Sequence, residues 1–215
     1  MIPKLHFISQ ETATLNHLQA IEAGCKAGVK LVQLRIKDKS AKYILRIAGE
    51  AKDICNMHGA KLIINDYPAI AKEVGAYGVH LGKEDMPVSE ARKIVGDMVI
   101  GTSANTLEDI VNYSKHKADY IGLGPFRFTA TKKKLNPILG IEGYKNIMQE
   151  RSKRGITTPI IAIGGIEAAD IPSIIETGIH GVAMSGAIVN STDIPQTIKQ
   201  IHSFLKEPEY ANHSR

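Results

Sequence analysis

The sequence predicts a single (β/α)₈ barrel of the TIM type, and three observations support this fold class. Apolar, β-branched runs alternate with helical patterns about eight times along the 215 residues. Hydrophobic residues make up 43% of the chain and aromatic residues only 5%, as expected for a parallel sheet packed with Ile, Val, Leu and Ala. No linker or shift in composition divides the chain. We therefore expect one domain over residues 1–207 and a frayed tail over residues 208–215.

Eight segments have the length and the residue types of buried strands. The first follows directly on the N-terminal residues, which lack the long apolar region of a signal peptide. In chain order the predicted strands are Lys4–Ser9, Leu31–Ile36, Lys61–Asp66, Gly78–Gly82, Met98–Ser103, Tyr120–Phe126, Pro159–Ile166 and Gly181–Ile188.

The segments between these strands show the periodicity of amphipathic helices. Apolar residues recur at spacings of three and four, as in HLQAIEAGCKAG and AKYILRIAGEAKDICNMHG. Several of these segments close on a glycine, which can end a helix in the left-handed conformation. These glycines are Gly28, Gly59, Gly96, Gly155 and Gly178. A doubly wound open sheet is the alternative fold, but the glycine fingerprint of dinucleotide-binding sheets does not follow the first strand.

Composition and charge argue against nucleic acid or a membrane as a binding partner and allow small phosphorylated substrates. The net charge of +5 comes from lysines and arginines that are scattered over the helices without interleaved aromatic residues, so we expect no nucleic-acid partner. A mild positive excess does suit small phosphorylated substrates. Cys25 and Cys55 fall within amphipathic segments, and we expect them to be reduced packing residues. No apolar run approaches the roughly 18 residues of a membrane span, which predicts a cytoplasmic protein without membrane contact. The sequence also allows a homo-oligomer.

Polar residues recur where the predicted strands end, which is where a barrel carries its functional side chains. The segment QLRIK places Gln33, Arg35 and Lys37 on one side of an extended chain. Cations beside a pair of carboxylates suit a polyphosphate that is bound together with a divalent metal. The full set comprises the cations Arg35, Lys37 and Lys132, the carboxylates Asp66 and Asp85, the amides Gln33 and Asn65, and the hydroxyls Ser103, Thr129 and Thr131.

The last two predicted strands end in small residues. PIIAIGGI closes on Gly164 and Gly165, and GVAMSGAI carries Ser185 and Gly186. In phosphate-binding barrels the loops after these strands bring backbone N–H groups to a phosphate, and glycine permits that close approach. Alternatively, the glycine pair only makes a tight turn. If both the basic strand ends and these glycine-rich strand ends bind phosphate, the substrates are two phosphorylated molecules or one molecule with phosphates at both ends.

Structural roles remain open for several of these residues. Arg35 and Lys37 could form rim salt bridges with Asp38 or Asp66. Asp66 and Asp85 could each cap the helix that follows.

Other polar residues have no assigned function. His80 lies in an apolar strand and is expected to be a packed structural histidine, and His180 lies at a turn without an obvious partner. Lys133 and Lys134 read as a solvated loop, and Arg127 is an additional cation without a role.

Taken in order, the motifs Q-L-R-x-K, I-N-D, G-V-H-L-G-x-E-D, G-P-x-x-x-T-x-T-K and A-I-G-G-I resemble the thiamine phosphate synthase family over essentially the whole chain. The resemblance implies a TIM-barrel transferase that joins hydroxymethylpyrimidine diphosphate to thiazole phosphate, giving thiamine phosphate and pyrophosphate. The reaction it implies is dissociative: the carbon–oxygen bond breaks with the help of Mg²⁺, and the thiazole nitrogen then captures the pyrimidine cation. Such a reaction requires no protein nucleophile, and the sequence shows no obvious Ser-His-Asp set.

The resemblance also implies a role for each matching position. Asp66 and Asp85 would be the Mg²⁺ ligands. The residues implied to hold the pyrimidine diphosphate are Gln33, Arg35, Lys37, Asn65, Ser103 and Lys132, of which Arg35, Lys37, Ser103 and Lys132 would be catalytic. The residues implied to bind the thiazole phosphate are Thr129, Thr131, Gly165, Ser185 and Gly186.

Two alternatives to the synthase function remain. A related thiazole tautomerase shares the barrel and the thiazole phosphate site, but it would carry a catalytic histidine in the sixth loop, where the segment FRFTATKKKLNPILG has none. A non-catalytic phosphate-binding regulator would bind ligand without turnover. The presence of Lys37, Asp66, Asp85 and Lys132 favours the synthase.

Overall fold

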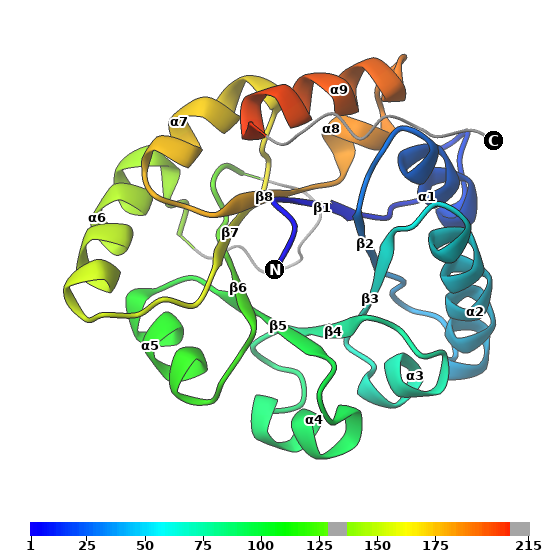
Figure 1. The fold of residues 1–215 in the computed structure, drawn as a ribbon, viewed down its shortest axis with the longest axis horizontal. Helices are drawn as coiled ribbons and strands as arrows, with labels where there is room; N and C mark the ends of the chain where they lie inside the picture. The colour runs from blue at the N-terminus through cyan, green and yellow to red at the C-terminus, as the bar shows by residue number, and fades with distance from the viewer. Residues whose placement is uncertain (129–136, 207–215) are drawn as a thin grey trace.

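The computed structural model describes residues 1–128 and 137–206, and its strands form a closed parallel barrel. The strands pair in chain order, and β8 (Gly181–Met184) closes the ring on β1 (Leu5–Ile8). Figure 1 looks down this barrel, with the strands inside and the helices around them. The predicted (β/α)₈ barrel is therefore confirmed. The open-sheet alternative is wrong, because β1 pairs with both β2 (Leu31–Leu34) and β8.

The strands coincide with the predicted segments but are mostly shorter. The strand predicted to run to Phe126 ends at Leu123, just before Pro125, which has no N–H for the ladder. The strand predicted to run to Ile188 ends at Met184, because the chain turns at Ser185 (ψ −83°) into the short helix α8 (Gly186–Val189). The remaining strands are β2 Leu31–Leu34, β3 Lys61–Asn65, β4 Gly78–Leu81, β5 Val99–Ala104, β6 Tyr120–Leu123 and β7 Ile160–Ile163.

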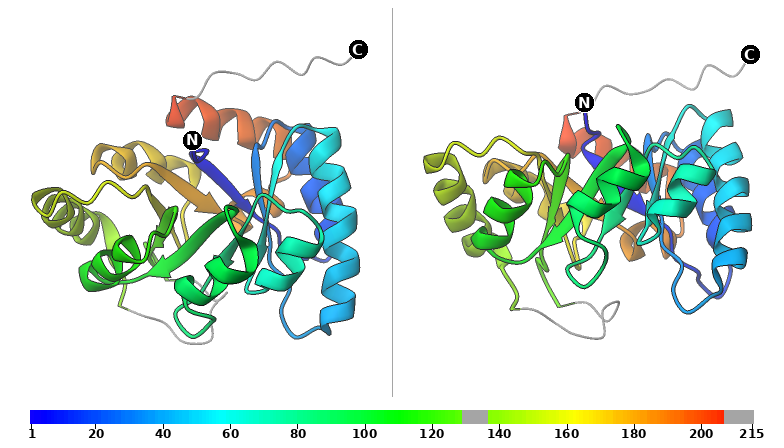
Figure 2. Two further views of the ribbon diagram at one scale, coloured as in Figure 1. Left: turned by 60° about the horizontal axis from the view of Figure 1, so that its bottom comes forward. Right: turned by 90° about the horizontal axis from the view of Figure 1, so that it is seen from below.

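Helices follow the strands and cover the outside of the ring. All five glycines predicted to end helices have positive φ, between 61° and 105°. The side views in Figure 2 show the chain entering at one end of the barrel and the helices standing around the strands. The helices are α1 His17–Lys26, α2 Ala41–Met57, α3 Pro68–Glu73, α4 Val88–Val95, α5 Leu107–Lys115, α6 Gly140–Lys153, α7 Ile171–Glu176, α8 and α9 Ile194–Leu205, with a 3₁₀ turn η1 at Ala168–Asp170.

Two apolar regions stabilise this arrangement. The larger one lies between the strands and the helices and is rich in Ile, Val, Leu and Ala. A smaller cluster of Tyr120, Ile161 and Ala183 lies inside the barrel. Polar side chains share the interior, among them the buried His6 and His80. Burial lowers the pKa of His6 to about 3, so this imidazole is neutral near pH 7.

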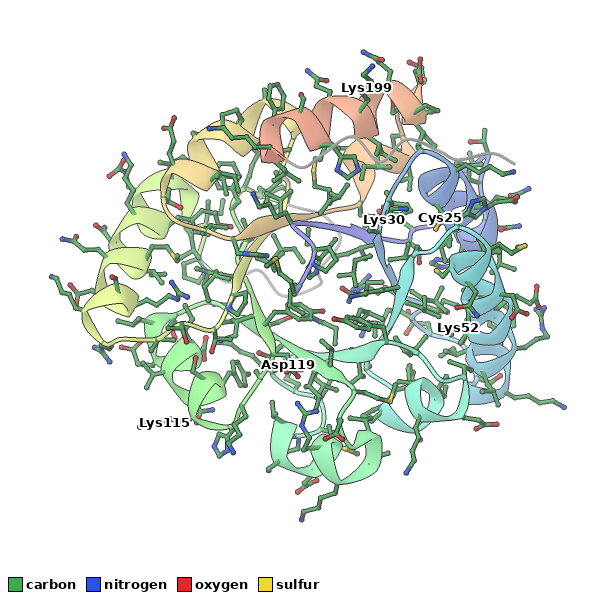
Figure 3. The ribbon with its side chains drawn as sticks, viewed as in Figure 1. Cys25, Lys30, Lys52, Lys115, Asp119 and Lys199 are labelled. Atoms are coloured by element: carbon green, nitrogen blue, oxygen red, sulfur yellow. The ribbon has the colours of Figure 1, made fainter. Side chains whose placement is uncertain are left out.

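The remaining expectations from composition concern charge, cysteine and membranes. Lysines are distributed around the ring, as Lys52 on α2, Lys115 on α5 and Lys199 on α9 illustrate (Figure 3). Cys25 and Cys55 are buried free thiols, as predicted. Within the described residues, no helix combines the length and the apolar character that crossing a membrane requires.

Candidate active site

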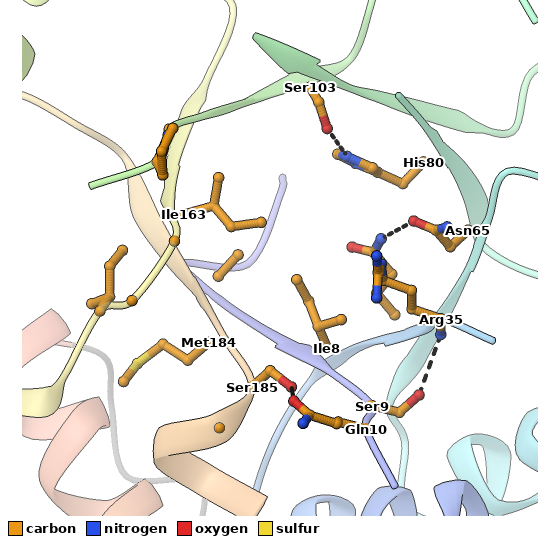
Figure 4. A pocket seen from close by; sticks show the side chains of 18 of the residues that line it. Ile8, Ser9, Gln10, Arg35, Asn65, His80, Ser103, Ile163, Met184 and Ser185 are labelled. Carbon is orange, nitrogen blue, oxygen red and sulfur yellow. Dashed lines mark hydrogen bonds between the residues drawn. The ribbon is translucent and has the colours of Figure 1, made fainter. Parts of the chain in front are cut away.

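A cavity of about 660 Å³ opens at the carboxyl ends of the strands. Figure 4 shows side chains from several strand ends converging on it. Ten predicted site residues line this cavity, namely Gln33, Arg35, Lys37, Asn65, Asp66, Asp85, Ser103, Gly165, Ser185 and Gly186. Thr129, Thr131 and Lys132 lie outside the described residues. The barrel thus brings together residues that are far apart in the sequence.

Two carboxylates and a lysine form the charged side of the cavity. Asp66 leaves β3 with φ 66°, and its backbone N–H donates to the carbonyl of His80 at 2.8 Å. Lys37 Nζ donates to the Asp66 carboxylate. Asp85 accepts the N–H of Gly82 at 2.6 Å. Burial, followed by the adjacent carboxyl of Asp85, raises the pKa of Asp66 although Lys37 opposes the shift.

Asp66 and Asp85 do not cap the helices that follow them. Helix α3 begins after Tyr67 and α4 after Pro87, and neither helix has a side-chain cap. The helix-capping interpretation of Asp66 and Asp85 is therefore wrong. The salt bridge between Lys37 and Asp66 is present. Arg35, in contrast, forms no ion pair within the part of the chain that the structure describes.

The donor set fits a magnesium ion that is bound together with a phosphorylated ligand. Among the described residues there is no group of three or more metal-ligating side chains. Mg²⁺, however, is usually bound by one or two carboxylates plus substrate phosphates, and not by an all-protein cage. Asp66 and Asp85 supply that number of carboxylates, and burial together with the proximity of Asp85 raises the pKa of Asp66.

This pKa shift gives a prediction for stability. We expect Asp66→Asn to raise the Tm of the unliganded protein by a few degrees at pH 7 and to leave it nearly unchanged at pH 3. A raised folded-state pKa means that protonated Asp66 favours the folded state, and this contribution is lost as the pH rises from the unfolded pKa through the folded pKa. Asparagine is neutral throughout and tolerates the φ of 66°.

Thermal unfolding of both proteins at the two pH values tests this expectation. Asp53→Asn on the exposed face of α2 is the matched control, since it removes a solvated carboxylate. A Tm difference for Asp66→Asn that is the same at both pH values would contradict the electrostatic explanation.

Amide and hydroxyl groups form a second set of cavity contacts. Gln33 Nε2 donates to Asn65 Oδ1 at 2.8 Å, so the two side chains on β2 and β3 hold each other. Asn65 is 6% exposed, and its Nδ2 has no acceptor among the described residues. A buried donor without an acceptor favours binding of a ligand oxygen or nitrogen. Ser103 Oγ lies 2.9 Å from His80 Nε2.

The opposite side of the cavity is built from backbone. Gly164 and Gly165 have φ of 103° and 65°. A Cβ on Gly164 would lie 2.7 Å from Pro125 Cβ, so the pair allows the β6–α6 connection to approach closely and does more than make a turn. Helix α8 begins at Gly186, and the first N–H groups of a helix have no intrahelical acceptor. Such N–H groups favour an anion.

Arg127, for which the sequence indicates no role, links the β6–α6 connection to the segment after β7. Its guanidinium makes two bonds to the carboxylate of Asp170, at 2.9 and 3.0 Å. It also donates to the carbonyl of Gly165 at 2.8 Å. These contacts fix the start of the β6–α6 connection against the segment after β7.

Sequence reasoning missed the end of β1. Ser9, Gln10 and His17 line the cavity, and Ser9 Oγ lies 2.9 Å from His17 Nδ1. Ser185 Oγ donates to Gln10 Oε1 at 3.1 Å, which links the first strand to the last (Figure 4). The polar residues directly after the first predicted strand were a usable signal, because the same rule found the other strand ends.

The structure confirms the expected packing of His80 but gives His180 a partner that the sequence does not indicate. His80 is 6% exposed and packed, as predicted, but it also lines the cavity and contacts Ser103. The interpretation of His180 as lacking a partner is wrong, since its Nε2 lies 2.8 Å from the carbonyl of Ile2.

Known proteins resemble this chain in sequence and in structure. The sequence profile of a family described as "Thiamine monophosphate synthase" matches residues 5–188. A "Thiamine-phosphate synthase" of Bacteroides fragilis is 44% identical over 92% of this chain and 97% of its own length. One of Flavobacterium johnsoniae is 45% identical over 99% of both chains. The solved structure of a thiamine phosphate pyrophosphorylase from Pyrococcus furiosus has a TM-score of 0.84 at 26% identity, over 94% of this chain and 95% of that one.

Proposed function

The chain belongs to the thiamine monophosphate synthase family of transferases, and we propose that it joins hydroxymethylpyrimidine diphosphate to thiazole phosphate, forming thiamine phosphate and releasing pyrophosphate. The observation that supports the proposal is that the two sides of the cavity have different linings. Arg35, Lys37 and the two carboxylates line one side, which would bind the diphosphate (the diphosphate side), and the backbone around Gly165 and Gly186 lines the other, which would bind the phosphate (the phosphate side). Two phosphorylated substrates require two such sides, with the reacting atoms between them.

The diphosphate side would act on the leaving group. Arg35 and Lys37 neutralise the negative charge that develops on pyrophosphate as the carbon–oxygen bond breaks. Asn65 Nδ2, a buried donor that has no acceptor among the described residues, donates to an oxygen or nitrogen of the same substrate. Asp66 and Asp85 would hold a Mg²⁺ ion, which when bound supplies further neutralisation of the diphosphate charge.

The phosphate side would orient the second substrate. Backbone N–H groups at Gly165 and at the start of α8 bind the phosphate, and Ser185 is held beside them by Gln10. This leaves the thiazole nitrogen to reach the pyrimidine carbon as the diphosphate departs. The protein needs no nucleophile or general base for this sequence of steps, because departure and positioning provide the acceleration. Thr129, Thr131 and Lys132 belong to the proposed site by sequence and lie outside the described residues.

The test is product formation by the purified protein from the two substrates, with Mg²⁺ and with a chelator. We expect thiamine phosphate and an equal amount of pyrophosphate with Mg²⁺, and neither product with chelator. Turnover that is unaffected by chelator would contradict the proposed metal. Thiazole phosphate binding without any product would instead support the tautomerase or the non-catalytic regulator.

A further inference from the structure

A chain of three polar side chains crosses the interior of the barrel and ends in the cavity. The hydroxyl of Tyr120 on β6 lies 3.0 Å from Nδ1 of His80 on β4. Nε2 of the same imidazole lies 2.9 Å from Oγ of Ser103 on β5. Ser103 and His80 line the cavity, whereas Tyr120 is 1% exposed and does not. Figure 4 shows the bond between His80 and Ser103 at the cavity wall.

The strand register explains why these side chains meet. His80 pairs with Gly101 on β5, and Gly101 pairs with Tyr120, so the three residues lie side by side on three adjacent strands. A Cβ on Gly101 would lie 2.0 Å from Cζ of Tyr120. The absence of a side chain at Gly101 therefore lets the tyrosine ring cross β5 and reach the histidine. The ring of His6 packs edge-on against Tyr120, with 4.8 Å between the ring centroids.

The direction of these hydrogen bonds follows from the buried tyrosine. Burial raises the pKa of Tyr120, so its hydroxyl stays protonated. Among the described residues, the only acceptor within reach of this hydroxyl is Nδ1 of His80. Nδ1 must then be the nitrogen without a proton, and a neutral imidazole carries its proton on Nε2. The opposite tautomer would leave a buried hydroxyl hydrogen without an acceptor, which folded proteins avoid.

The same direction decides what Ser103 offers to a ligand. Since Nε2–H of His80 donates to Oγ, the hydroxyl hydrogen of Ser103 cannot be donated back to the histidine. It is available to an acceptor in the cavity. With the other tautomer, Ser103 would donate to His80 and present only lone pairs.

We propose that Tyr120 and His80 are positioning residues that fix Ser103 as a hydrogen-bond donor to an acceptor atom of the phosphorylated substrate, either a phosphate oxygen or a ring nitrogen. The identity of the substrate rests on the proposed function, but the hydrogen-bond direction is a property of the unliganded protein. Tyr120 acts through the other two residues and never touches the substrate.

The first experiment measures the tautomer directly and needs no substrate. In protein with ¹⁵N-labelled histidine, long-range proton–nitrogen correlations should show His80 protonated on Nε2, with the signals assigned by their loss in His80→Gln. Tyr120→Phe should shift His80 toward the Nδ1–H form. The matched control is Tyr144→Phe, which also removes a buried hydroxyl, one that donates to the carbonyl of Leu123 at 2.9 Å, and it should leave the tautomer unchanged. Wild-type protein with His80 protonated on Nδ1, or no response to Tyr120→Phe, would overturn the proposal.

The second experiment is a kinetic double-mutant cycle. We expect Tyr120→Phe to lower kcat/KM for the pyrimidine diphosphate about tenfold when Ser103 is present. In the Ser103→Ala background the same change should have almost no effect, because the donor that it orients is gone. An equal loss in both backgrounds would mean that Tyr120 acts only on stability. If the wild-type protein makes no thiamine phosphate, the proposed function fails, and the tautomer measurement still decides the hydrogen-bond direction.

Binding measurements then separate the two acceptors. Calorimetric titrations with inorganic pyrophosphate and with unphosphorylated hydroxymethylpyrimidine would be compared between wild type and Tyr120→Phe. Weaker binding of pyrophosphate alone identifies a phosphate oxygen as the acceptor, and weaker binding of the pyrimidine alone identifies the ring nitrogen. Unchanged binding of both ligands would contradict a donor role for Ser103.

Discussion

Asp85→Ala should lower kcat/KM by about 10²- to 10³-fold while the protein remains folded. Asp85 is half-buried at the cavity rim, where it accepts one backbone N–H from Gly82 and faces Asp66. Its removal takes away one of the two carboxylates proposed to hold Mg²⁺ and leaves the packed core untouched. Steady-state rates over a series of Mg²⁺ concentrations, together with thermal unfolding, would measure both effects.

Asp119→Ala provides a matched control at another position in the barrel. Asp119 also accepts a backbone N–H, that of Ile100 at 2.8 Å, and it pairs with Arg92, but it precedes β6 instead of following a strand (Figure 3). We expect this variant to lose stability and to keep its kcat/KM. Full activity of Asp85→Ala at limiting Mg²⁺ would show that the metal assignment is wrong.

The fold could be predicted because its signal is repeated along the chain. Each of eight strand segments has the same apolar character, and a parallel strand must be followed by a crossover of helical length. The errors came at strand ends. Met184 and Ile188 have similar side chains, yet the chain leaves the sheet between them, because Ser185 turns it into α8. Apolar residues in a short helix and in a strand end cannot be distinguished by periodicity alone.

The sequence predicts which residues lie at the rim of the barrel, because every residue that directly follows a strand must lie there. Asp66 and Asp85 could be identified because each follows a strand, and all strands of a parallel barrel end at the same rim. Their proximity to each other and to Lys37 required the structure. Arg127 shows the limit of the same rule. It follows β6, but its position in the sequence does not reveal its partner Asp170, which lies 43 residues further on.

The hydrogen bonds from Tyr120 to His80 and from His80 to Ser103 could not be predicted from the sequence, for a related reason. Tyr120 reaches His80 only because Gly101 lies between them in the register of three adjacent strands. Spacing along the chain carries no information on that register. Tyr120 could therefore be predicted only as the first residue of a strand, and Gly101 only as a small residue within one.

Gly181→Ala should destabilise the protein by about 3 kcal/mol or more, a large part of the roughly 5–15 kcal/mol that holds a typical domain folded. Gly181 begins β8, where the barrel closes on β1. A Cβ at this position would lie 2.1 Å from the carbonyl oxygen of Lys4 and 2.6 Å from its Cα. That carbonyl accepts the N–H of Val182 at 2.7 Å, so the backbone cannot move away without loss of a bond that closes the barrel.

Gly49→Ala is the matched control, because the chemical change is the same and only the surroundings differ. Gly49 lies within α2 and has open space where a Cβ would be, so alanine should stabilise the helix by about 0.5–1 kcal/mol. Urea unfolding of the two variants should therefore give shifts of opposite sign. Because the β1–β8 seam also holds Ser185 against Gln10, Gly181→Ala should weaken thiazole phosphate binding in the fraction that remains folded. If Gly181→Ala had the stability of the wild type, β8 would be able to move away from β1 at this position, and their close approach would not be essential to the fold.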